Sequence, residues 1–205
     1  MHLIFDFDGT LVDSFYCVID VFNALAVDFN FRKIAVDEID DLKNLTAKEL
    51  ISSLQIPIYK IPVILYKAKI YMREEMHHLK PFPGISQALH ELYDSGFQLG
   101  IVTSNSEQNV ISWLHDHNIR QYFKFIHSAP NYFGKAKTLQ KIIKMNKLDR
   151  ETIYYIGDET RDIDAAIQCG ISSIAVTWGF NSEKIISEHN PHYLVRKPED
   201  ILSLF

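Results

Sequence analysis

Two aspartates near the start of the chain have the residue type and spacing to bind a cation or exchange a proton. Asp6 and Asp8 directly follow an apolar run, and Gly9 and Thr10 come next. Because alternate residues of a strand point to the same side, the two carboxylates should share one face at the carboxyl end of a strand. Carboxylates held this close favour a bound cation or a shared proton, and Gly9 allows a sharp turn behind them.

Polar residues also stand at the ends of two later apolar runs. Thr103 ends one run, and Ser104 and Asn105 come directly after it. A hydroxyl at such a place can donate to developing negative charge, although Ser104 and Asn105 are also common turn residues. Asp158 follows another run, and Asp162 lies one helical turn beyond it. A helix dipole alone explains acids at a helix start, but it does not explain the matching aspartates on the first strand.

A lysine is the remaining candidate for chemistry. Lys135 lies between Gly134 and Ala136, just before an expected helix. A fixed ammonium would stabilise a neighbouring carboxylate and bind a phosphate group as a point charge. Lys137 is a rival for this role, and we favour Lys135 because Gly134 places it directly in the loop.

The elements that must position these residues alternate in the second half of the chain. Apolar runs predict strands at residues 3–7, 97–103, 123–127, 152–156, 173–178 and 192–195, with helices between them and a last helix from residue 199. Strands separated by helices of this length predict an α/β fold with a parallel sheet that is covered on both faces. Ligands of such sheets bind beyond the carboxyl ends of the strands, where the predicted site residues would meet.

Residues 14–80 have a different pattern, with helices and no convincing strand. Phe15, Phe22 and Phe29 share one helical face and are expected in the core. The sequence Pro81-Phe82-Pro83-Gly84 then forms a stiff connector. We therefore predict a core domain of residues 1–13 and 81–205 and an inserted helical domain of residues 14–80.

Four segments in the right order resemble the motifs of the haloacid dehalogenase-like (HAD) hydrolases. Residues 6–10 resemble motif I, DxDGT, and Thr103 stands where motif II has its hydroxyl. Lys135 resembles the lysine of motif III, although many relatives have Lys-Pro where this chain has Lys-Ala. Residues 157–162 resemble motif IV, GDxxxD. The resemblance implies a Rossmann-like core with a C1-type helical cap, and it is strongest to phosphoglycolate-phosphatase-like members.

The resemblance also implies residue roles. Asp6 would be the nucleophile that forms an aspartyl-phosphate, and Asp8 the general acid and base. The family holds Mg²⁺ with the Asp6 carboxylate, the Asp8 backbone carbonyl and the Asp158 carboxylate. Thr103 and Lys135 would bind the phosphoryl group. The supporting positions would be Gly9, Thr10, Ser104, Asn105 and Asp162, the last acting through water or by orienting the lysine.

Several alternatives remain open at this stage. Asp8 favours phosphoryl transfer over carbon–halogen cleavage, because a halide leaving group needs no proton. A sugar phosphomutase of the β-phosphoglucomutase type shares all four motifs, and a non-catalytic binding module on the same scaffold is a further alternative. Lys43 or Lys48 could serve as a Schiff-base lysine, as in the phosphonatase branch, but nothing indicates a desolvated amine.

Residues outside the motifs give weaker expectations. Lys43, Asn44, Thr46 and Lys48 are candidates for contacts with the far end of a substrate. Thr46 also fits a capping box with Glu49. For Glu159 and Arg161, which lie between Asp158 and Asp162 in the sequence, we expect surface or capping roles.

Composition restricts the partners. The chain has 205 residues and a formal net charge of −5, without a lysine- or arginine-rich run that would suit a nucleic acid. No apolar run reaches the length of a membrane span. The two isolated cysteines, Cys17 and Cys169, suggest a reducing, cytoplasmic setting. We expect a small phosphorylated metabolite as the partner, and either a monomer or a homodimer.

Overall fold

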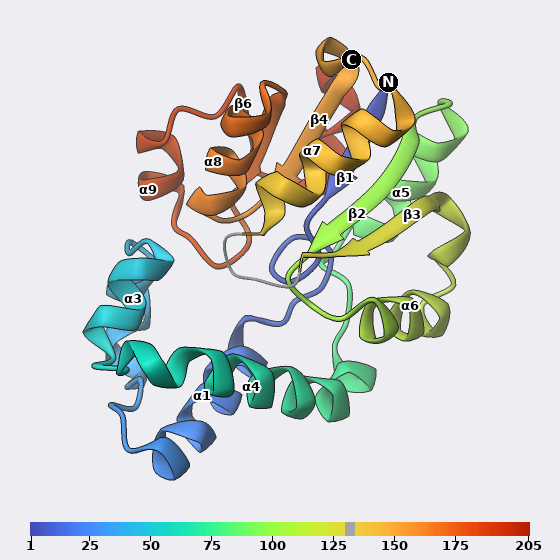
Figure 1. Ribbon diagram of the computed structural model, residues 1–205. Coiled ribbons are helices and arrows are strands. Elements are labelled where there is room, and N and C mark those ends of the chain that lie inside the picture. The colour runs from blue at the N-terminus through green and yellow to red at the C-terminus, as the bar shows by residue number, and fades with distance from the viewer. Residues whose placement is uncertain (130–133) are drawn as a thin grey trace.

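The fold is built on one six-stranded parallel sheet. The computed structural model describes residues 1–129 and 134–205. The strands are β1 (His2–Phe5), β2 (Gln98–Thr103), β3 (Phe123–Ser128), β4 (Ile153–Gly157), β5 (Ser172–Val176) and β6 (Tyr193–Val195). Their order is β3-β2-β1-β4-β5-β6, and every neighbouring pair is parallel (Figure 1). The predicted α/β class is therefore confirmed.

Helices cover both faces of this sheet. Helices α5 (Ile85–Asp94) and α6 (Glu107–Asp116) lie on the face to which Leu3 and Phe5 of β1 point. Helices α7 (Lys135–Asn146) and α8 (Thr160–Cys169) lie on the opposite face with Ile4, and α9 (Glu183–Glu188) packs beside α8. The alternation follows from strand geometry, because successive side chains of β1 point to opposite faces. Full burial of each such side chain stabilises the fold by about 1.5–3 kcal/mol.

The strand order reverses at β1. The chain continues from β1 to β2 and β3 on one side, whereas β4, β5 and β6 are added on the other side. Diverging connections leave a crevice at the carboxyl end of the central strand, which is the usual ligand site of such sheets. Asp6 and Asp8 directly follow β1, so they stand at this crevice.

The inserted residues 14–80 form a separate helical group, which we call the cap. Its helices are α1 (Phe15–Phe29), α2 (Ile39–Leu42), α3 (Ala47–Ser53) and α4 (Ile61–Glu75), with 3-10 turns at Val36–Glu38, Ile58–Lys60 and Met76–His78. Helices α1 and α4 pack against each other (Figure 1). Helix α3 begins at the predicted capping box, where the Thr46 backbone N–H donates to Glu49 at 2.8 Å.

The two chain segments that join the cap to the sheet run side by side. The Asp13 backbone N–H donates to the carbonyl of Lys80 at 3.0 Å, and the Phe82 N–H donates to the carbonyl of Leu11 at 3.1 Å. Val12 and Pro81 form an antiparallel bridge between them. This paired connection coincides with the predicted boundaries, but the division into two domains stays a prediction.

Two expected elements differ in the structure. The first strand ends at Phe5 instead of residue 7, because the Phe7 carbonyl accepts from the N–H groups of three residues in the following loop. The expected last helix is instead two 3-10 turns, Pro198–Asp200 and Leu202–Leu204, in which backbone N–H groups donate to the carbonyl three residues earlier, as Ile201 does to Pro198 at 3.2 Å. Among the described residues, every helix is too short or too polar to cross a membrane.

Candidate active site

The predicted site residues meet at the carboxyl ends of three neighbouring strands. Asp6 follows β1, Thr103 is the last residue of β2, and Asp158 follows β4. Lys135 begins α7, and Asp162 lies in the first turn of α8. All five side chains are buried.

Lys135 joins two of these carboxylates. Its Nζ atom lies 2.5 Å from Asp6 Oδ2 and 2.6 Å from Asp162 Oδ1. Burial alone would lower the pKa of Lys135, but the carboxylates of Asp162 and Asp6 outweigh it and raise the pKa above its usual value. The lysine therefore stays charged, whereas its rival Lys137 is exposed on the surface of α7.

Asp158 is held by the two loops that surround it. The Thr10 hydroxyl donates to its Oδ1 at 2.6 Å, and the Phe180 backbone N–H donates to its Oδ2 at 2.7 Å. Gly9 has φ +76°, and a Cβ there would lie 2.2 Å from Asp158 Oδ2. Gly179 is similarly restricted, with 2.3 Å to the same oxygen. Both loops thus need glycine to approach this carboxylate.

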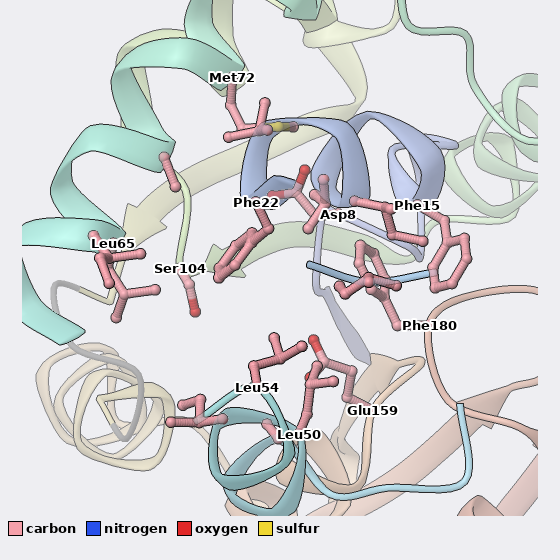
Figure 2. A pocket seen from close by; sticks show the side chains of 18 of the residues that line it. Asp8, Phe15, Phe22, Leu50, Leu54, Leu65, Met72, Ser104, Glu159 and Phe180 are labelled. Carbon is pink, nitrogen blue, oxygen red and sulfur yellow. The ribbon is translucent and has the colours of Figure 1, made fainter. Parts of the chain in front are cut away.

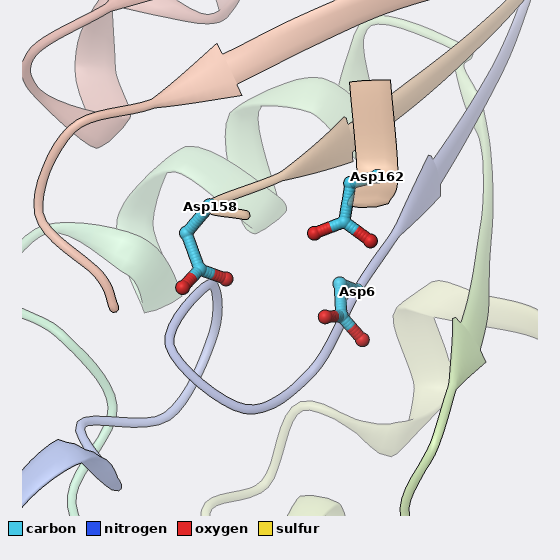
Figure 3. A group of neighbouring side chains, drawn as sticks. All are labelled: Asp6, Asp158 and Asp162. Atoms are coloured by element: carbon cyan, nitrogen blue, oxygen red, sulfur yellow. The ribbon is translucent and has the colours of Figure 1, made fainter. Parts of the chain in front are cut away.

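Three buried carboxylates form a compact cluster. Oxygen atoms of Asp6, Asp158 and Asp162 lie within 4.8 Å of one another (Figure 3). Burial raises the pKa of Asp6 to about 7 despite the opposing charge of Lys135. Burial, followed by the negative charge of Glu159 and Asp6, raises the pKa of Asp158 well above its usual value.

This cluster fits a divalent cation. With Glu159 it brings together four carboxyl groups and two cationic side chains, Lys135 and Arg161, so the acidic groups outnumber the basic ones by two. Concentrated carboxylate oxygens favour a hard cation such as Mg²⁺. A cation would also offset the burial that raises the pKa values of Asp6 and Asp158, together with the repulsion between carboxylates that adds to it.

Asp8 has a different environment. Its Oδ2 accepts a hydrogen bond from Asn105 Nδ2 at 2.9 Å, whereas its buried Oδ1 has no hydrogen-bond partner among the described residues. Burial raises the pKa of Asp8, and the bond from Asn105 only partly opposes this. Asn105 is itself fixed, because its N–H donates to Thr103 Oγ1 at 3.0 Å and its Oδ1 accepts from Asn109 at 3.1 Å. A protonated Asp8 carboxyl can donate into the adjacent space.

That space is a cavity of about 610 Å³ between the cap and the strand ends. Figure 2 shows Asp8 and Ser104 of the core among its lining residues, together with Phe22, Leu54 and Leu65 of the cap. Of the predicted site residues, Asp8, Ser104 and Asn105 line this cavity, so these three residues and the cap face one common volume.

Glu159 and Arg161 differ in how far they meet the expectation of a surface or capping role. Glu159 precedes α8 as expected of a capping residue, whereas Arg161 lies within α8 and is neither a cap nor a surface residue, since its side chain is only 21% exposed. Arg161 pairs with Glu159 at 2.5 Å and donates to Ser104 Oγ at 3.1 Å. Both side chains line the cavity. The sequence feature that could have indicated a place at the site was their position between Asp158 and Asp162.

The loop after β5 was missed by the sequence analysis. Phe180 supplies a backbone N–H to Asp158, and Asn181 accepts from the Thr160 N–H at 3.0 Å. The Asn181 amide also donates to the carbonyls of Lys43 and Leu45 in the cap, at 3.2 and 3.0 Å. The only sequence feature that pointed to this loop was its place after a predicted parallel strand, because a backbone donor has no characteristic residue type.

The cap candidates fall into two groups. Lys43 lines the cavity, with Nζ 4.2 Å from the centre of the Phe15 ring. Asn44 accepts a hydrogen bond from Ser182 Oγ at 2.5 Å, and Thr46 caps α3. Lys48 is exposed and does not line the cavity.

The expected core aromatics differ only in part from the prediction. Phe22 and Phe29 are partly buried and pack against the hydrophobic core. Phe15 and Phe22 line the cavity, because the cap leaves this side of α1 open toward the site. Ser14 precedes α1 as predicted for an N-cap residue, but its side chain makes no capping hydrogen bond.

The family follows from comparison with known proteins. Residues 3–176 match the model of the haloacid dehalogenase-like hydrolase family. The chain belongs to the haloacid dehalogenase-like hydrolases. This hydrolase is 31% identical over 200 residues to a phosphoglycolate phosphatase of Synechococcus elongatus, covering 98% of this chain and 94% of the relative. It is 27% identical to a phosphoglycolate phosphatase of Vibrio cholerae, covering 93% and 90% of the two chains.

A solved structure agrees on the fold. A putative phosphoglycolate phosphatase from Lactobacillus plantarum superposes with a TM-score of 0.85 at 21% identity, covering 100% of this chain and 98% of that chain. At this identity the likeness concerns the fold alone. The family match and the phosphatase relatives that align over nearly their whole length make this hydrolase a HAD-type phosphatase enzyme, which does not fit the non-catalytic alternative. The predicted family is confirmed, whereas the individual residue roles stay predictions.

Proposed function

We propose that this phosphatase hydrolyses a small phosphate monoester with Mg²⁺, through an aspartyl-phosphate on Asp6. The arrangement of Asp6 beside Lys135 at the strand ends carries this proposal, with Asp8 next to it on the cavity wall. Phosphoglycolate is the first compound to test, because the full-length relatives have that activity in their names.

Asp6 attacks phosphorus in the first step. Lys135 keeps this carboxylate oriented and contributes a positive charge beside the phosphoryl oxygens. The Thr103 hydroxyl and the backbone N–H groups after Asp6 are the further donors for the charge that develops in the transition state. The P–O bond to the leaving group breaks as the bond to Asp6 forms.

Asp8 serves both half-reactions. In its protonated form it donates a proton to the leaving alkoxide, and as a carboxylate it then accepts a proton from the water that hydrolyses the aspartyl-phosphate. A raised pKa suits the first of these roles, and the hydrogen bond from Asn105 orients the carboxyl group for both.

Mg²⁺ would be held by the carboxylates of Asp6 and Asp158. When bound, it supplies Lewis-acid stabilisation of negative charge on the phosphoryl oxygens. Thr10 and Phe180 orient Asp158 for this purpose, and Asp162 positions Lys135.

The test is phosphate release from a panel of monoesters by the native protein and by Asp6→Asn, each with Mg²⁺ and with EDTA. The panel includes phosphoglycolate, sugar phosphates and nucleoside monophosphates. We expect turnover that requires Mg²⁺ and is lost by at least about 10³-fold in the variant, because no other group replaces the nucleophile. Near-native turnover by Asp6→Asn would refute the mechanism, and accumulation of a sugar bisphosphate in place of free phosphate would indicate a mutase.

A further inference from the structure

The cavity beside Asp8 is larger and more apolar than a short, charged substrate requires. Its volume is about 610 Å³, within the roughly 300–1,000 Å³ that is usual for pockets of drug-sized ligands. The cap wall consists mainly of aliphatic and aromatic side chains from α1, α3 and α4. Examples are Phe22, Ile51, Leu54, Leu65 and Met72.

The polar side chains of the cavity are concentrated on the sheet side. Asp8, Ser104 and Asn105 lie there, together with the ion pair of Glu159 and Arg161. Figure 2 shows Asp8, Ser104 and Glu159 around the same cavity as the apolar side chains Leu65 and Met72 of α4. One end of a ligand would therefore meet polar groups, while most of its body would meet hydrocarbon.

We propose that the substrate's leaving group is an apolar alcohol, aliphatic or aromatic, that fills the cap side of this cavity. The inference rests on the proposed phosphatase function and specifies its substrate class. Phosphoglycolate would then be a poorer substrate than a phosphate ester of a longer hydrocarbon alcohol.

The position of Asp8 indicates that the leaving group of the substrate fills the cavity. The leaving oxygen must come within reach of this carboxyl group to receive its proton, and Asp8 lines the cavity. The carbon atoms attached to that oxygen therefore extend into the same volume. Asp8 belongs both to the proposed reaction site and to the cavity wall, so the leaving group can fill the cavity without a separate docking partner.

Two lysines are the cationic side chains of the cap wall among the described lining residues. Lys43 lies over the Phe15 ring, so its charge is already in contact with an aromatic face. Lys69 on α4 is half-buried and makes no ion pair with any described residue. Lys69 is the group that would bind a carboxylate if the substrate were phosphoglycolate, and it therefore supplies a direct test of the competing assignment.

The energetic expectation follows from burial of hydrocarbon. Each methylene group transferred from water into an apolar site favours binding enough to raise kcat/KM by about three- to fourfold. A glycolate leaving group would leave much of the volume unfilled, and its carboxylate would lose hydration against hydrocarbon. The increase in kcat/KM should end when the alkyl chain of the substrate reaches the far wall of the cavity.

The experiment measures kcat/KM with Mg²⁺ for methyl, butyl, hexyl and octyl phosphate and for phosphoglycolate. We expect a rise of about threefold per methylene over the series, with phosphoglycolate below butyl phosphate. Leu65→Glu places a charge on the cavity wall and should flatten the dependence on chain length. Val63→Glu, on the same helix but outside the cavity, is the matched control and should keep the native dependence.

Two results would overturn the inference while leaving the phosphatase intact. One is a kcat/KM of the native protein that does not depend on the length of the alkyl chain of the ester. This measurement does not require any variant to fold. The other is phosphoglycolate as the best compound, with Lys69→Met reducing its kcat/KM at least tenfold and leaving alkyl phosphates unchanged. Absence of turnover on every monoester would instead refute the proposed function itself.

Discussion

At the scale of single residues, the site depends on one loop that approaches a carboxylate closely. Gly9 has a left-handed backbone and leaves no room for a side chain beside Asp158. Gly9→Ala should therefore displace Asp158 and lower kcat/KM by at least about 10²-fold, besides the backbone cost of about 1–2 kcal/mol for a left-handed alanine.

A matched glycine separates the two effects. Gly96 has φ +84° and nothing within 4 Å of its would-be Cβ. Gly96→Ala should lower the free energy of unfolding by a similar amount in urea denaturation but leave kcat/KM unchanged. Equal loss of activity in both variants would show that the approach to Asp158 is not required.

The two rival lysines give a second prediction at this scale. Lys135→Met removes the cation between Asp6 and Asp162, and we expect kcat to fall by at least about 10³-fold, because two buried carboxylates lose their shared partner. Lys137→Met should retain native kcat, since this side chain is exposed. Steady-state kinetics of the two variants test this, and the reverse ranking would contradict it.

Residue types predicted the acidic part of the site but not its supports. Asp6, Thr103 and Asp158 could be placed together, because they end strands of one parallel sheet. Phe180 could not be found in this way, because it contributes a backbone N–H. The partial burial of Arg161 also depends on tertiary packing that no local pattern encodes.

At the scale of elements, the loop after β5 connects the core to the cap. Asn181 receives the first N–H of α8 and donates to two carbonyls of the loop before α3. Asn181→Ala should lower the free energy of unfolding by about 1–3 kcal/mol, because buried backbone groups lose their partners. It should also raise KM by about three- to tenfold, because the loosened cap carries the wall that faces the substrate. This change in KM corresponds to about 0.6–1.4 kcal/mol of binding free energy.

Urea denaturation and steady-state kinetics measure the two effects. The control is Asn146→Ala, which removes one local hydrogen bond from an exposed side chain at the end of α7. It should change the free energy of unfolding only slightly and leave KM unaffected. An unchanged KM in Asn181→Ala would show that the contact is structural only.

Local signals predicted the elements where they were strong. The Thr46–Glu49 capping box gave the start of α3, and Gly96 follows the end of α5 with the left-handed backbone that such helix ends favour. The prediction of a last helix was wrong, because apolar spacing over a few residues does not distinguish an α-helix from two short 3-10 turns.

At the scale of the whole molecule, the alternation of strands and helices was sufficient to predict a parallel sheet with a functional edge. It could not predict how the cap sits over that edge, because the contacts involve backbone carbonyls of Lys43 and Leu45. The size of the cavity follows from this placement, and for that reason the apolar lining was first interpreted as core. The monomer or homodimer alternative stays a prediction.

The most direct test of the central claim is to trap the phosphorylated residue. The native protein is mixed with Mg²⁺ and its best monoester, quenched in acid within one turnover, reduced with borohydride and analysed by peptide mass spectrometry. The account predicts that Asp6 is converted to homoserine, and that this conversion is absent without substrate. Turnover with reduction at another residue instead of Asp6 would contradict it. Turnover without any trapped acyl-phosphate, under conditions that trap one in a control phosphatase, would contradict it as well.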